Sequence, residues 1–238
     1  MADESRSLSE IIKERNTVSP SEHILNVLKA GLATAPFCGG ISSLMTDYIP
    51  KSKLTRLEDF AQKVADDLEA LQDRIDESSI LTDDFAYTFE RCFRGAAENY
   101  QREKLEAFRG ILINSALGSN LQEDEKEYFL NLVSTLSVLH MRVLKFMSSP
   151  VQYLKDNDIP QNSIRGGFSQ FFPAAIPRVN IEVIKSAFGD LYQYGFFNTD
   201  KSIFSITASV QGLDLLGNGS RVTEFGKRFS NFCESPCS

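Results

Sequence analysis

A mainly α-helical fold is predicted: an antiparallel helical bundle followed by a small winged-helix-like α+β unit at the C-terminus. The bundle follows from three long stretches in which apolar residues recur three and four positions apart. The C-terminal unit follows from the last sixty or so residues, where two helix patterns enclose a short β-like run and a glycine-rich loop. With 42% apolar and 24% charged residues, the chain has the composition of an ordinary globular protein.

The strongest periodic signal lies at residues 51–76, inside a bundle expected over residues 19–148 behind a flexible arm at residues 1–18. Its apolar positions form a narrow seam with charged residues on the other faces: Leu54, Leu57, Ala61, Val64, Leu68, Leu71 and Ile75. A seam this narrow favours packing against another helix, from the same chain or from a partner.

Two more long helices complete the predicted bundle. The second starts at a cap around Thr82 and continues to about Leu117, with Gly95 and Gly110 as points where it could bend or break. The third begins near Gln122 and ends at Pro150.

A hairpin of two short helices, bent at Pro36, is expected over residues 24–49. Residues 30–46 carry no charge, but they are too few and too mild for a spanning helix, which needs ~20 strongly apolar residues. Burial in the bundle is the favoured interpretation. Reversible membrane insertion is the alternative, because small-residue hairpins also pack in lipid. Its central residues are Pro36, Phe37, Gly39, Gly40 and Ile41.

The C-terminal part is divided into a Pro/Gly-rich connector at residues 149–178 and the winged-helix-like unit at residues 179–238. The connector holds a short helix at residues 151–155 and an aromatic patch formed by Phe168, Phe171 and Phe172. In the final unit, Asn180 caps a helix that Gly195 closes, residues 203–207 form a β-like run, and Thr223 caps the last helix.

The search for catalytic or ligand-binding residues is negative. His23 and His140 are the only histidines, so few residues could form a metal cluster or a catalytic triad. His140 is interpreted as a packed or half-exposed helix residue. Cys233 and Cys237 lie four apart but lack further zinc ligands. Neither phosphate-binding glycine motif occurs. We therefore predict no enzyme activity, no cofactor and no metal.

The charge and the cysteines indicate which partners and which cellular compartment to expect. The net charge of −7, with acids and bases mixed along the chain, disfavours nucleic acid and anionic membranes as partners. The four cysteines are scattered and the N-terminus shows no signal peptide, which favours a reducing, cytoplasmic location.

Two segments resemble known proteins. Residues 35–50 and the charged helix after them resemble the N-terminal helical part of poorly characterised bacterial proteins. The ending Arg-Val-Thr-Glu-Phe-Gly-Lys-Arg-Phe at residues 221–229 is similar to the C-terminal wing and helix of the abortive-infection alpha family. The resemblance implies a bacterial host and a role in phage defence, and it brings no catalytic residues with it.

The leading hypothesis is a noncatalytic adaptor or scaffold that binds a protein partner, or a second copy of itself. The predicted binding surface is the aromatic connector or the seam of the first long helix, with Leu54, Leu57, Val64, Leu68 and Leu71. Two alternatives remain open. One is a membrane-active effector that inserts the hairpin at residues 24–49, and the other is a winged-helix transcriptional regulator.

Overall fold

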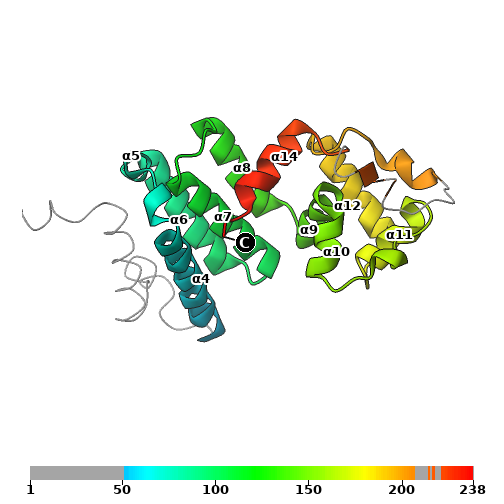
Figure 1. Ribbon diagram of the computed structural model, residues 1–238, viewed down its shortest axis with the longest axis horizontal. Coiled ribbons are helices and arrows are strands. Elements are labelled where there is room, and N and C mark those ends of the chain that lie inside the picture. Colours follow the sequence, from blue (N-terminus) through cyan, green and yellow to red (C-terminus); the bar gives the residue numbers. More distant parts are fainter. Residues whose placement is uncertain (1–50, 207–213, 215, 218–220, 238) are drawn as a thin grey trace, which may run out of the picture. The chain divides into compact units, whose positions relative to one another are not determined.

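The computed structural model describes residues 51–206, 214, 216–217 and 221–237, which are mainly helical (Figure 1). They form two compact units. Unit 1 contains residues 51–100, 108–130 and 235–237, and unit 2 contains residues 101–107 and the described part of 131–234. Each unit is thus assembled from segments far apart in the sequence. The sequence-based boundaries at residues 148 and 178 fall inside unit 2.

In unit 1 the predicted first helix forms as α4 (Lys51–Ala70) and is followed by η1 (Gln72–Arg74) and α5 (Glu77–Ile80). Its apolar seam packs against α6 (Asp83–Glu98), where the rings of Phe60 and Phe93 meet edge to face at 5.2 Å. Val64 and Leu68 are buried. The helical partner that the narrow seam requires is therefore present in the same chain.

The predicted second helix is in fact two helices, α6 and α7 (Arg102–Ala116). The Thr82 side chain caps α6 by accepting from the Phe85 N–H, as expected. The break falls at Asn99, whose backbone is extended and whose side-chain amide donates to the Gly95 carbonyl oxygen at 2.8 Å. The expectation of a break at Gly95 or Gly110 was wrong because Asn99 supplies a C-terminal cap that periodicity does not reveal.

Gly95 instead provides a close contact in unit 1. A Cβ atom at this position would lie 2.3 Å from Cζ of the buried Phe108 ring. Carbon atoms in van der Waals contact are ~3.5–4.0 Å apart, so the ring fits only against a residue without a side chain. The glycine therefore sets how closely α6 and the second half of α7 approach.

A turn centred on Asp76 follows η1. Its carboxylate accepts from the Ser78 amide and hydroxyl and from the Ser79 hydroxyl, and its own N–H donates to the Ala116 carbonyl oxygen at 3.0 Å. The serine hydroxyls, which stabilise the charged form, lower the pKa of Asp76 from 3.8 to about 2. The turn thereby fastens the segment after η1 to the end of α7.

The predicted third helix is also broken, into α8 (Glu123–Thr135) and α9 (Val138–Ser148). Ser137 starts α9 through a capping box: its hydroxyl accepts from the His140 N–H, and its own N–H donates to His140 Nδ1. Lys104 helps to end α8, because its buried ammonium group donates to the carbonyl oxygens of Val133 and Ser134 at 2.7 and 2.9 Å.

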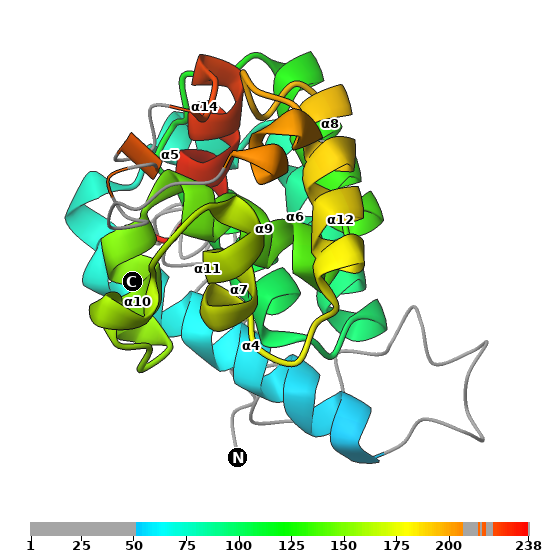
Figure 2. The ribbon, with the colours of Figure 1, turned by 90° about the vertical axis from the view of Figure 1, so that its right-hand side faces the viewer.

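After α9, unit 2 continues through further helices and short 3-10 turns, and α12 packs against α9 and α11 (Figure 2). Its remaining elements are α10 (Pro150–Asp156), η2 (Gln161–Ser163), α11 (Phe168–Ala175), α12 (Ile181–Gln193), η3 (Lys201–Ser205) and α14 (Glu224–Cys233). Their starts agree with the sequence, since Asn180 caps α12 and Thr223 caps α14.

Phenylalanine rings fill the core of unit 2. Phe172 lies at the centre, with ring centroids 5.3 Å from Phe146, 6.2 Å from Phe188 and 5.2 Å from Phe204. Such edge-to-face and tilted pairs contribute beyond the area they bury. The aromatic patch of the connector is part of this core, because all three of its phenylalanines are fully buried.

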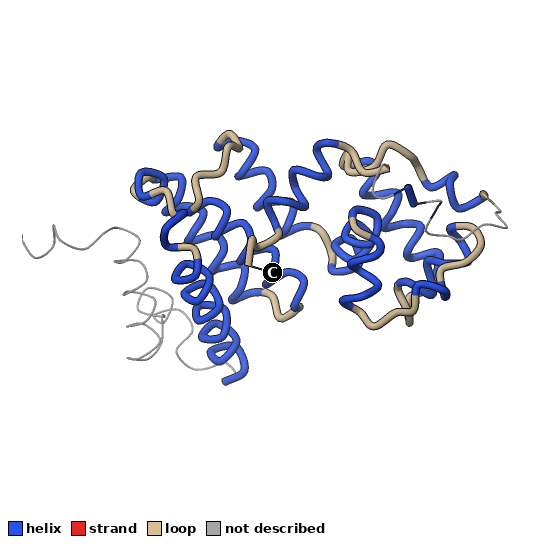
Figure 3. Tube along the Cα trace, viewed as in Figure 1, coloured by secondary structure: helices blue, strands red, loops and turns tan. Residues whose placement is uncertain are grey.

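The winged-helix prediction is not supported. Residues 203–205 of the expected β-like run lie in η3, a 3-10 turn that Asp200 caps by accepting from the Ser202 N–H. The described residues contain no strand (Figure 3). Only an isolated bridge pairs Phe197 with Val222. Residues 203 and 204 turn inward to the aromatic core, and this burial overrides their β propensity.

The N-terminal arm at residues 1–18 and the hairpin at residues 24–49, with Pro36, Phe37, Gly39, Gly40 and Ile41, lie outside the described residues. Within the described ranges, no single helix has the length and apolar content needed to cross a membrane. Helices α8 and α9, bent at their junction, meet that test only as a pair.

Candidate functional site

The seam predicted as an interaction surface is largely covered by unit 1 itself. Val64, Leu68 and Leu71 are buried and Leu57 is half-buried, while the side chain of Leu54 lies outside the described part of the chain. The aromatic patch of the connector is likewise core. Both surfaces that the sequence suggested for binding, the seam of α4 and the aromatic patch, are therefore largely used in packing within the chain. Periodicity identifies an apolar face of a helix but not the element that covers it.

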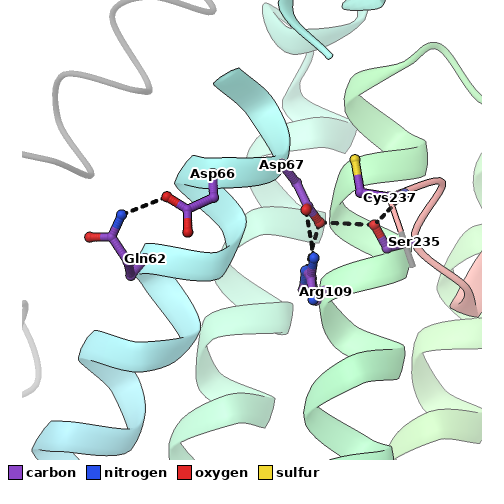
Figure 4. Close-up of polar contacts among 6 residues, drawn as sticks. All are labelled: Gln62, Asp66, Asp67, Arg109, Ser235 and Cys237. Atoms are coloured by element: carbon purple, nitrogen blue, oxygen red, sulfur yellow. Dashed lines mark hydrogen bonds and ion pairs between the residues drawn. The ribbon is translucent and has the colours of Figure 1, made fainter. Parts of the chain in front are cut away.

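A buried polar cluster in unit 1 joins α4, α7 and the end of the chain (Figure 4). The guanidinium group of Arg109 donates from Nε and Nη2 to the two carboxylate oxygens of Asp67 at 2.6 and 2.5 Å. The Ser235 hydroxyl donates to the same carboxylate at 2.8 Å. The Asp67 side chain is 5% exposed, so its charge depends on these donors for stabilisation.

Cys237 completes this cluster from the chain end, where its N–H donates to the Ser235 hydroxyl oxygen (Figure 4). Partial burial and the neighbouring Asp67 carboxylate raise the pKa of its thiol. A thiol with a raised pKa is a poor nucleophile at neutral pH. The cluster therefore fastens residues 235–237 to α4 and is not suited to thiol chemistry.

Helix α12 lines two hollows on the surface of unit 2. The larger, about 570 Å³, lies beside its first turns and η3, and it brings Lys185, Lys201 and three serines together with two acids. The smaller, about 330 Å³, lies beside its last turn and the α8–α9 junction; we call it the His140 hollow. It is lined by Thr135, Leu136, His140, Asp190, Gln193 and Tyr194.

His140 links α9 to α12 at this hollow. Its Nδ1 lies 2.7 Å from the Ser137 hydroxyl oxygen, and its Nε2 lies 3.2 Å from Oδ2 of Asp190. The sequence identified His140 as a packed or half-exposed helix histidine, and its side chain is 16% exposed. The pairing of His140 with Asp190, 50 positions away, could not be predicted from the sequence. The three-residue spacing between Ser137 and His140 is typical of a helix cap and could have predicted their contact.

The three residues resemble a catalytic triad in composition but not in arrangement. In serine hydrolases the carboxylate orients Nδ1 and the serine faces Nε2. Here Nδ1 faces Ser137 and already accepts from its backbone N–H, so Nε2–H is the group that donates to Asp190. The Ser137 hydroxyl accepts from the His140 N–H as a helix cap. This arrangement orients α9 and α12 and is poorly suited to general-base catalysis.

The exposed sides of α12 also carry large side chains. Val183 is 53% exposed and Tyr194 is 39% exposed, and their spacing from Asp190, seven and four positions, puts both on the side of the helix that carries this acid. Tyr192, also 39% exposed, points to a different side, because residues two positions apart on a helix do not face each other. The opposite face, with Ile184, Phe188 and Leu191, is buried. Helix α12 therefore presents exposed aromatic rings on a support held by the phenylalanine core.

No group of three or more His, Cys, Asp or Glu side chains within the described ranges is placed to hold a metal ion. Comparison with known proteins gives no match to the chain among protein-family models, curated proteins or solved structures.

Proposed function

We propose that this chain is a noncatalytic helical interaction protein that binds a protein partner through the solvent face of α12 in unit 2. The observation that supports the proposal is the position of α12. It lines both hollows, exposes Val183 and Tyr194 on the side that carries Asp190, and is held in place by its buried face. This face replaces the covered seam of α4 as the proposed surface.

Physical features of a good interface support the choice. Tyrosine is enriched at protein interfaces because its ring buries a large area while its hydroxyl group forms hydrogen bonds. A helix held by packing loses little conformational entropy on binding, so more of the contact energy appears as affinity. The reversed order of the groups around His140 favours binding over acyl transfer at the same place.

Charge favours a different protein over a second copy. Glu182 and Asp190 lie on the exposed side of α12, and the whole chain carries a net charge of −7. A two-fold dimer through this face would place two copies of these acids in one interface. A partner with a basic surface would be attracted instead.

The cellular setting is a further proposal. A bacterial role in phage defence rests on the resemblances at residues 35–50 and 221–229, and the cytoplasmic location rests on the scattered cysteines and the N-terminal sequence. Membrane insertion of the hairpin at residues 24–49 depends on residues outside the described part. The transcriptional-regulator alternative has no support among the described residues, where η3 stands in place of the expected β-like run.

Site-specific photo-crosslinking tests the interaction. A benzoylphenylalanine placed at Tyr194 should give one discrete heterologous protein adduct in bacterial cells, and the same group at Tyr100 in unit 1, which is 73% exposed, should not. The purified partner should bind the wild-type chain, and it should bind the Val183→Ala/Tyr194→Ala variant at least ~tenfold more weakly. Adducts that are equal at both positions, that contain only a second copy, or that do not form would refute the proposal.

A further inference from the structure

We infer that the His140 hollow binds a guanidinium group, presented as an arginine side chain by the partner. This inference rests on the proposed function, because it specifies what the partner places beside the last turn of α12. The hollow, about 330 Å³, is large enough to receive the end of an arginine side chain.

The carboxylate of Asp190 supplies the charge for this site. Oδ2 accepts from His140 Nε2 at 3.2 Å, which fixes the orientation of the carboxylate group. The side chain is 56% exposed, and within the described part of the chain Oδ1 has no hydrogen-bond partner. A second charge-assisted hydrogen bond at Oδ1 would therefore need no rearrangement.

The backbone around the hollow adds negative potential. The last turn of α12, at Gln193 and Tyr194, opens onto it, and the C-terminal end of a helix carries a partial negative charge. The last turn of α8 also ends there, but the Lys104 ammonium group already neutralises part of it through the Val133 and Ser134 carbonyl oxygens. The end of α12 and Asp190 thus provide most of the attraction for a cation.

The remaining groups favour guanidinium over ammonium. Guanidinium is planar with five N–H donors, and it stacks on aromatic rings. The hollow offers a tyrosine ring at Tyr194 together with oxygen acceptors on Gln193 and Thr135. A lysine ammonium group would use the carboxylate but neither the ring nor the spread of acceptors.

The second hollow does not carry a comparable inference. Its two lysines lie beside Glu182 and Asp200, and Lys185 is paired with Glu182 at 2.8 Å. Cations and anions are balanced there, so its lining does not select a ligand of either charge.

The test uses N-acetyl-argininamide as the probe and the full chain as the receptor. The chain has only two histidines, so His140 gives one of two imidazole Hε1 signals in the NMR spectrum, assigned with a His23→Gln variant. Titration at fixed pH should shift the His140 signal saturably at millimolar probe. Asp190→Asn, which keeps an acceptor for His140, should weaken binding at least ~tenfold, while Asp200→Asn should not change it.

N-acetyl-lysinamide should bind several-fold more weakly than the arginine probe. Equal binding of the two probes, equal binding to the Asp190→Asn variant, or no saturable shift would overturn the inference. A partner crosslinked at position 194 whose affinity is unchanged by Asp190→Asn would also overturn it while leaving the proposed function intact. Probe binding without any heterologous adduct would refute the function and leave the guanidinium site standing.

Discussion

Replacing either of two helical glycines with alanine should change the free energy of unfolding, but in opposite directions. Gly95 lies in α6, where a Cβ atom would stand 2.3, 2.5 and 2.7 Å from three carbons of the Phe108 ring. Gly189 lies in α12, where the nearest atom to a Cβ would be Lys201 Cδ at 3.8 Å, an ordinary contact. Both substitutions gain the higher helix propensity of alanine, which is worth about 1 kcal/mol.

At Gly95 the steric overlap outweighs the gain in helix propensity, so the substitution should destabilise the protein. Phe108 is fully buried, so the ring can reach ordinary contact distance only by displacing its neighbours, and overpacking of this kind costs about 1–3 kcal/mol. Gly95→Ala should therefore lower the free energy of unfolding by up to ~2 kcal/mol. Gly189→Ala should raise it by up to ~1 kcal/mol, since only the propensity gain applies.

Urea denaturation followed by circular dichroism would measure both changes. A double-mutant cycle supplies the control: with Phe108→Leu in place, Gly95→Ala should cost less than in the wild type, with a coupling of ~0.5–3 kcal/mol. If Gly95→Ala stabilised the protein as Gly189→Ala does, the close contact would not exist and the reasoning would fail.

The remaining predictions concern single charged or thiol groups. Arg109→Leu leaves the buried Asp67 carboxylate without its ion pair and should lower the free energy of unfolding by about 3–5 kcal/mol. The control variant Arg102→Leu breaks an exposed ion pair and should change the free energy of unfolding by less than about 0.5 kcal/mol. Equal losses of stability in urea denaturation would contradict this prediction. The pKa of Asp76 is lowered from 3.8 to about 2 in the folded protein. The ionised carboxylate therefore stabilises the fold fully above pH 3.8, and this stabilisation is lost as the pH falls toward about 2. The difference in urea midpoint between wild type and Asp76→Asn should therefore shrink over that interval, and a constant difference would exclude the titration of Asp76 as its source. Burial raises the pKa of the Cys92 thiol, so iodoacetamide should modify Cys237 well before Cys92 in the folded protein, which peptide mapping by mass spectrometry can check against a urea-unfolded control.

Local signals allowed the starts of helices to be predicted. Thr82, Asn180 and Thr223 each accept a hydrogen bond from an N–H two or three residues later, so their effect is encoded within a few positions. Periodicity predicted α4 and its buried face in the same way. The caps at Asn99 and Ser137 are equally local, but each falls within a continuous apolar pattern that indicated one long helix.

Only the tertiary structure decided what the helices cover and which distant residues meet. The periodic seam and the three connector phenylalanines are apolar in any arrangement, and packing alone determined that they form core and not a binding surface. Asp67 meets Ser235 across 168 positions, and His140 meets Asp190 across 50. Contacts at such separations arise from the mutual packing of whole elements, so neither the buried cluster nor the exposed face of α12 could be predicted from sequence spacing.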